Sequence, residues 1–130
     1  MRIFLILAAL SALPQCQSDE TVRAYGAGDS VWRLVELNGA PFEGRATLQF
    51  PETGEIVGEA PCNSYSTTME VPYPWFGTGP LAVTRRACPD LGVEVNFFRA
   101  LEGATLSEVL GDTMILSDDS GPTLVFKTDD

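Results

Sequence analysis

Hydrophobic and polar residues alternate with a period of two over most of the chain after residue 30, which is typical of β-strands. In residues 46–50, for example, Ala46, Leu48 and Phe50 fall on one face. Turn-forming stretches such as Asn38-Gly39 separate these segments. The pattern predicts strands over residues 31–37, 46–50, 55–60, 80–84, 104–110, 112–119 and 122–127.

The period changes in residues 92–103, which predicts a helix. Asp90 is placed to cap its start and Gly103 to end it. Its apolar face is expected to hold Val93, Phe97, Ala100 and Leu101. One helix among antiparallel strands predicts an α+β domain, with a curled, barrel-like antiparallel sheet and one packed helix. The predicted core is Trp32, Leu34, Leu48, Phe50, Phe97, Leu101, Leu116 and Phe126.

The N-terminus has the pattern of a secretory signal peptide. Arg2 precedes an apolar run that ends at Leu13, and this run is shorter than the roughly 20 residues needed to span a bilayer. We therefore expect residues 1–15 to be a signal peptide; the alternative is a buried N-terminal strand or helix.

Cys16 follows this run and is similar to the cysteine of a bacterial lipoprotein box, with Leu13 at the matching position. We predict that Cys16 is lipidated, although the box usually has a small residue where this chain has Gln15. The polar, glycine-containing residues 16–30 are expected to form a flexible tether, and residues 31–130 the domain.

Charge and composition exclude several classes of function. The chain has 18 acidic and 8 basic residues, a net charge of −10, which argues against binding to nucleic acids or anionic lipid surfaces. It has no histidine, which excludes Ser-His-Asp and Cys-His catalysis and histidine zinc sites. We therefore expect no catalytic residue, no metal and no cofactor, and a monomer.

A series of short motifs resembles the META-domain (HslJ-like) family, in the family's order and over about residues 31 to 127. The motifs are Trp32-Arg33-Leu34, Asn38-Gly39, Leu48-x-Phe50, Gly58, Cys62-Asn63-x-Tyr65, Thr84, Ala87-Cys88, Glu94-x-x-Phe97, Leu101, Met114-Ile115-Leu116 and Leu124-x-Phe126. The chain departs from the family at Pro61, where a glycine is common, and at Arg85-Arg86, where methionines are common.

The resemblance implies a non-catalytic protein of the cell envelope, periplasmic or anchored facing the periplasm, that is linked to stress or serves as a structural or binding module. An envelope protein, a peptide or an apolar ligand is the expected partner. The alternative is a small envelope enzyme or redox protein that uses carboxylates or Cys62 and Cys88.

The family pattern also pairs Cys62 with Cys88, and we predict a disulfide between them, as suits an exported domain. Two free buried thiols, a redox pair and a metal site are the other interpretations of these cysteines. Asn63 is expected to support a turn. Glu94 matches a family position and, by its place in the first helical turn, is expected to compensate the helix dipole.

The strongest candidate for a binding surface is the aromatic group Tyr73, Trp75 and Phe76, which is costly to expose and alternatively closes one end of the sheet. Arg85 and Arg86 are expected to pair with surplus carboxylates; the alternative is an anionic ligand. Residues 117–121 are expected to form a hairpin turn rather than a calcium loop.

Overall fold

The computed structural model describes residues 18–129. Its helical segments are the 3-10 helix η1 (Val22–Tyr25) and the α-helix α1 (Leu91–Gly103). The strands are β1 (Trp32–Leu37), β2 (Ala40–Pro41), β3 (Thr47–Leu48), β4 (Gly54–Glu59), β5 (Ser64–Met69), β6 (Ala82–Val83), β7 (Leu106–Leu110), β8 (Thr113–Asp118) and β9 (Gly121–Thr128).

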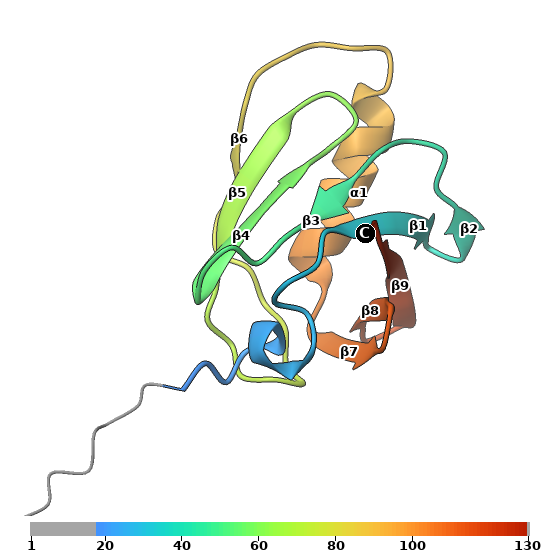
Figure 1. Ribbon diagram of the computed structural model, residues 1–130. Helices are drawn as coiled ribbons and strands as arrows, with labels where there is room; N and C mark the ends of the chain where they lie inside the picture. The colour runs from blue at the N-terminus through green and yellow to red at the C-terminus, as the bar shows by residue number, and fades with distance from the viewer. Residues whose placement is uncertain (1–17, 130) are drawn as a thin grey trace, which may run out of the picture.

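These strands form two antiparallel sheets (Figure 1). The larger sheet has the order β2-β1-β9-β8-β7, with β3 also paired to β1, and the smaller has the order β4-β5-β6. A bridge between Gln49 and Val57 connects the two. The prediction of antiparallel strands with one helix is therefore confirmed, but the fold is mostly β, and no strand pairing in residues 18–129 closes or curls it into the predicted barrel.

The turn between β1 and β2 follows directly from the sequence. Asn38 and Gly39 have φ angles of 52° and 81°, and Leu37 pairs with Ala40 across them. A two-residue hairpin turn with two positive φ angles favours the pair Asn-Gly, because both residues tolerate that conformation. The predicted turn is thus the tip of a hairpin.

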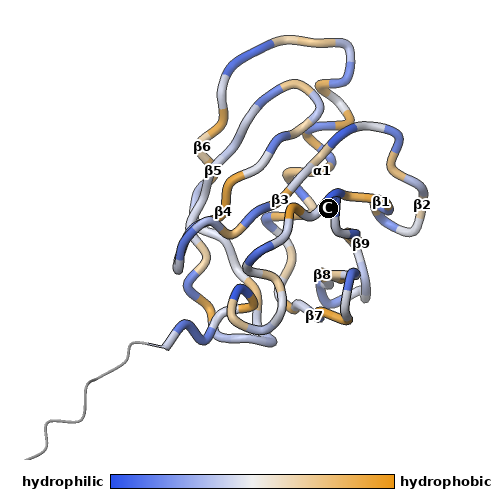
Figure 2. The backbone as a smooth tube through the Cα atoms, in the orientation of Figure 1, coloured by the Kyte–Doolittle hydropathy of each residue, from blue (hydrophilic) through white to orange (hydrophobic). Residues whose placement is uncertain are grey.

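Strand β5 was missed by the hydrophobic pattern. Its buried residues Tyr65, Thr67 and Met69 alternate with exposed ones, but most of the strand is serine and threonine. Figure 2 shows β5 as near-neutral to weakly hydrophilic beside the hydrophobic middle of β4. The Thr67 hydroxyl donates a hydrogen bond to the Gly79 carbonyl at 2.8 Å, and this bond allows a polar side chain to be buried there.

Helix α1 runs behind the region where β1, β3 and β4 meet (Figure 1). It begins after Asp90, whose side chain makes no capping hydrogen bond, so that part of the prediction was wrong. The buried residues of α1 are Glu94, Phe97 and Leu101, whereas Val93, which we expected on the inner face, is 40% exposed. The buried face of α1 is therefore centred on Glu94, Phe97 and Leu101, and it is rotated away from Val93 compared with the prediction.

The predicted tether is packed against the domain where the structure describes it. Val22 and Ala27 are fully buried in the core. The indole N–H of Trp32 donates to the Ala27 carbonyl at 3.0 Å, and this bond is buried. Residues 18–30 therefore belong largely to the folded unit, because their few apolar side chains fill the end of the core.

All eight residues of the predicted core are buried, with at most 2% of their surface exposed. The aromatic rings of Phe97 and Tyr65 meet edge to face at 5.7 Å and join α1 to β5. Within residues 18–129, no helix combines the length and the apolar character that crossing a membrane requires.

Candidate functional site

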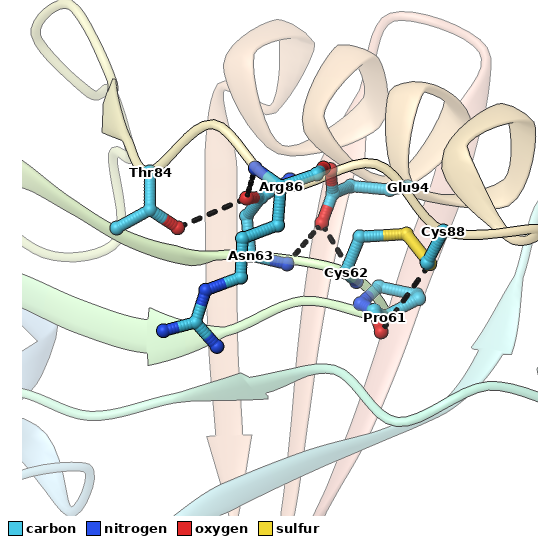
Figure 3. Close-up of a disulfide and its surroundings, with 7 residues drawn as sticks. All are labelled: Pro61, Cys62, Asn63, Thr84, Arg86, Cys88 and Glu94. Carbon is cyan, nitrogen blue, oxygen red and sulfur yellow. Dashed lines mark hydrogen bonds between the residues drawn. A yellow bond between two sulfur atoms is a disulfide. The ribbon is translucent and has the colours of Figure 1, made fainter.

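The stretch between β4 and β5 reverses the chain and carries the first cysteine of the domain. The N–H of Ala60 donates to the Asn63 carbonyl at 2.7 Å, which closes the turn. Cys62 and Cys88 form a disulfide with a Cα–Cα distance of 5.6 Å (Figure 3), so the predicted pairing is confirmed. The bond joins this turn to the segment before α1, 26 residues further along the chain.

Glu94 reaches this turn from the first turns of α1. Its side chain is almost fully buried, with 3% exposure. One carboxylate oxygen accepts from the backbone N–H groups of Cys62 and Asn63, at 3.0 and 2.8 Å. The other accepts from the Asn63 side-chain amide at 2.7 Å. Glu94 lies in the first turn of α1, as the helix-dipole expectation requires, and it is in addition an internal anchor of the β4–β5 turn.

Asn63 connects this anchor to the segment before α1 (Figure 3). Its side-chain oxygen accepts from the backbone N–H of Arg86 at 2.6 Å and from the Thr84 hydroxyl at 3.0 Å. Its amide nitrogen also donates to the Arg86 carbonyl at 3.1 Å. The expectation that Asn63 supports a turn is confirmed, and it also fixes a second segment.

The disulfide, Asn63 and Glu94 together join three stretches of chain: the β4–β5 turn, residues 84–88 and α1. Each buried polar group has its partners, which is the condition under which a buried charge is stable. A carboxylate whose oxygens already accept three N–H bonds is poorly placed to act as a base. Within residues 18–129, no three side chains of the metal-binding types are grouped together.

An open cleft of about 730 Å³ lies next to this cluster. It crosses the outer surface of β4, β5 and β6 and reaches β3. Its lining is mostly small or hydroxyl-bearing, and includes Thr47, Val57, Ser64, Ser66, Ala82 and Thr84. A volume of this size is in the range of small-molecule and peptide sites, which is roughly 300–1,000 Å³.

Gly58 and Tyr65 define the floor of the cleft. The Tyr65 hydroxyl donates to the Thr47 carbonyl at 2.7 Å. A Cβ atom on Gly58 would collide with that carbonyl and would lie 2.6 Å from the hydroxyl, so this crossing requires glycine. Burial raises the pKa of Tyr65, which keeps its phenol neutral. The cleft thus has a rigid floor without a charge.

The arginines near the cleft are arranged differently from our expectation. Arg45, at its rim, pairs with Asp129 at 3.1 Å and with Glu59 at 3.7 Å. Arg85 and Arg86 are exposed, and neither forms an ion pair with a carboxylate of residues 18–129, so the predicted pairing was wrong. In Figure 3 the Arg86 side chain extends away from α1 toward the strands.

The aromatic surface that we predicted is divided. Phe76 is buried with 4% exposure, and Tyr73 is half-buried, with its ring stacked on Tyr25 at 4.7 Å. Trp75 alone of the three is strongly exposed, at 57%. Two members therefore close an end of the domain, and one is presented to the surroundings.

Two smaller predictions also have outcomes. Residues 117–121 form a hairpin turn, in which Asp118 accepts from the Ser120 backbone N–H at 2.8 Å. Hydrogen bonds from the Ser120 hydroxyl and N–H lower the pKa of Asp118. Cys16 and the expected signal peptide, residues 1–15, lie outside the described residues.

The cleft had no counterpart in the sequence prediction. The chain carries one local signal for it, the small outward residues Ser64 and Ser66 on either side of Tyr65. Such a signal becomes readable only when the strand β5 and its partners are known, because a cleft is formed by several strands.

The sequence model of the META-domain family matches residues 27–130. The chain belongs to the META-domain family. The match begins before residue 31, in agreement with the packing of Ala27 against this META domain.

Solved structures have the same fold. The NMR structure of a Burkholderia xenovorans protein is 23% identical, with a TM-score of 0.65, and the match covers 83% of this chain and 87% of the other. A crystal structure of a DUF4847-family protein from Bacteroides vulgatus is 13% identical, with a TM-score of 0.67, and covers 84% and 97%. None of the curated proteins compared matches the chain. At these identities the similar structures establish the fold alone.

Proposed function

We propose that this META-domain protein is an exported, non-catalytic module of the cell envelope that binds a protein, a peptide or an apolar ligand in the cleft across β4, β5 and β6. In this proposal residues 1–15 direct export and Cys16 carries the lipid anchor that holds the domain at a membrane facing the periplasm. A role in stress responses rests only on the resemblance to the family.

One observation carries the non-catalytic part of the proposal: the reactive groups of the site are occupied in holding the fold. Both cysteines are in the disulfide, and Glu94 accepts three hydrogen bonds. The same disulfide supports export, because such bonds persist mainly in oxidising compartments. In this proposal the disulfide, Asn63 and Glu94 hold in place the β4–β5 turn and residues 84–88, which border the cleft.

Site-specific photocrosslinking in living cells tests the binding part. A benzoylphenylalanine at Ser66, in the lining of the cleft, should crosslink a partner. The same group at Ser120, exposed in the β8–β9 turn, is the matched control and should not. Absence of a crosslink at Ser66, or equal crosslinking at both positions, would refute the use of the cleft.

Fractionation of cells tests the anchor. The Cys16→Ser variant should leave the membrane fraction, whereas the native protein should stay in it. The same soluble distribution for both would reject lipidation. An insulin-reduction assay tests the alternative redox function. A redox protein would reduce insulin disulfides, and its Cys62→Ala/Cys88→Ala variant would not. Our proposal predicts no reduction of insulin by either form.

A further inference from the structure

Residues 18–20, η1, the segment 72–76 and β7 lie together at one end of the domain. The Glu20 carbonyl accepts from the Tyr73 N–H at 2.7 Å, and the Tyr25 ring is stacked on Tyr73. Gly26, which follows η1, packs against β7 at Val109. In Figure 1 this end is opposite the first turns of α1.

The chain is fixed to this end from Asp19 onward. One oxygen of Asp19 accepts from the Thr21 N–H at 2.9 Å, and the other pairs with Arg23 at 3.5 Å and accepts from the Thr53 hydroxyl at 3.4 Å. Three Cα–Cα steps separate Cys16 from Asp19, and they span at most about 11 Å. A lipid on Cys16 would therefore hold Asp19, and with it the start of this end of the domain, within about 11 Å of the lipidated residue.

Four of the seven large apolar side chains that are exposed in residues 18–129 lie at the same end, and the other three are on α1. Trp75 pairs with Leu106 in an antiparallel bridge, and Leu110 lies on the same exposed face of β7 as Leu106, with Glu108 between them. Their exposed fractions are 57%, 38% and 60%, and that of Tyr25 is 53%. We call these four residues, Tyr25, Trp75, Leu106 and Leu110, the anchor-side patch.

The backbone holds Trp75 firmly while its indole remains exposed. The N–H of Trp75 donates to the Pro72 carbonyl at 2.8 Å. On either side, the Pro74 carbonyl accepts from Ser107 at 2.7 Å and the Phe76 N–H donates to Thr105 at 2.8 Å. The backbone position of Trp75 is therefore set in advance, which suits an exposed ring to contact with another surface.

We propose that the anchor-side patch rests on the bilayer, with Trp75 and Tyr25 at the level of the lipid headgroups. This inference rests on the proposed lipidation of Cys16. Tryptophan and tyrosine favour the membrane interface, because they combine an apolar ring with a polar group. The net charge of −10 disfavours anionic lipids, so the surface that fits is a zwitterionic one.

Quenching of tryptophan fluorescence by brominated lipids tests the proposal. The lipidated protein, which begins at Cys16 in this proposal, is reconstituted into vesicles of phosphatidylethanolamine and brominated phosphatidylcholine. The chain has two tryptophans, and Trp32 is fully buried, so the quenching should come from Trp75. We expect quenching of the native protein and its loss in Trp75→Phe.

A matched control moves the tryptophan to the opposite end. Val95, on the outer side of α1, is 49% exposed, and the variant Trp75→Phe/Val95→Trp should be unquenched. Insertion of ten Gly/Ser residues after Gln17 adds a flexible spacer of roughly 16–19 Å and should reduce the quenching of Trp75. If quenching is unchanged after this insertion, the short connection between Cys16 and Asp19 is not what brings Trp75 to the membrane.

The outcomes separate this inference from the anchor itself. If the protein fails to float with the vesicles, both the anchor and the orientation are wrong. If it floats, and the native protein and Trp75→Phe are quenched equally, the anchor stands and the membrane contact is refuted. Equal quenching at Trp75 and at a tryptophan in position 95 would also refute a fixed orientation. A Trp75 left unquenched would then be available to a protein partner.

Discussion

Replacing Glu94 by glutamine should destabilise the domain strongly, although the two side chains have nearly the same shape. The amide oxygen of glutamine can still accept from the N–H groups of Cys62 and Asn63. Its NH₂ group then faces the Asn63 side-chain NH₂, where native Glu94 has an acceptor 2.7 Å away. Two donors would meet there.

Neither amide can turn over to relieve this contact. If the introduced glutamine turned, its NH₂ group would face the two backbone N–H groups that native Glu94 accepts. If Asn63 turned, its oxygen would lose the N–H of Arg86, at 2.6 Å, and the Thr84 hydroxyl, at 3.0 Å. One hydrogen bond to a charged group contributes about 1.5–3 kcal/mol, and the other two weaken when the charge is removed, so we expect a loss of roughly 2–4 kcal/mol.

Urea unfolding of the oxidised domain measures this loss. The midpoint should fall without a change in slope, because the surface exposed on unfolding is the same. The matched control is Glu102→Gln, an exposed position on the same helix, which should stay within about 0.5 kcal/mol of the native protein. If Glu94→Gln is as stable as the control, the carboxylate does not anchor the β4–β5 turn.

Three further predictions concern stability. Removing the disulfide in a Cys62→Ala/Cys88→Ala variant should cost roughly 3.5 kcal/mol for a loop of this length by the chain-entropy model, and an unchanged urea midpoint would contradict it. Gly58→Ala should lower the thermal midpoint by overpacking, at a cost of about 1–3 kcal/mol or more, whereas Gly103→Ala, with open space around the position, is the control that should not. Burial tends to raise the pKa of Asp19, but the hydrogen bonds from Thr21 and the charge of Arg23 outweigh it and lower the pKa. Ionised Asp19 therefore stabilises the domain at pH values above the ordinary carboxyl pKa of about 3.9, and this stabilisation is lost as the pH falls through the lower pKa of the folded state. The difference in unfolding free energy between the native protein and Asp19→Asn should be largest near pH 7 and should shrink in acid.

The parts of the fold predicted from the sequence are those that depend on hydrophobic period. The core from Trp32 to Phe126 could be predicted because each apolar residue marks its own face of a strand or helix. The turn at Asn38-Gly39 could be predicted because its backbone conformation favours these two residue types. Both are local properties of the chain.

The parts that could not be predicted depend on partners distant in the chain. Glu94 is polar by every scale, yet it is buried, because its donors come from residues more than 30 positions away. Residues 18–30 are polar and short of apolar groups, but Val22 and Ala27 find room in a core that the rest of the chain builds. Trp75 and Phe76 are adjacent and similar, and only the pairing with β7 determines which one is exposed.

The C-terminal end of the chain is closely attached to the rest of the domain. The N–H of Asp129 donates to the Val31 carbonyl at 2.8 Å, and its carboxylate pairs with Arg33 and Arg45. Arg45 borders the cleft, so a reporter fused directly after Asp129 would start beside the proposed binding surface and disturb the ion pair there. The β8–β9 turn at Asp119 and Ser120 is exposed and is formed by local bonds, which makes it the better place to insert a fluorescent protein or an epitope.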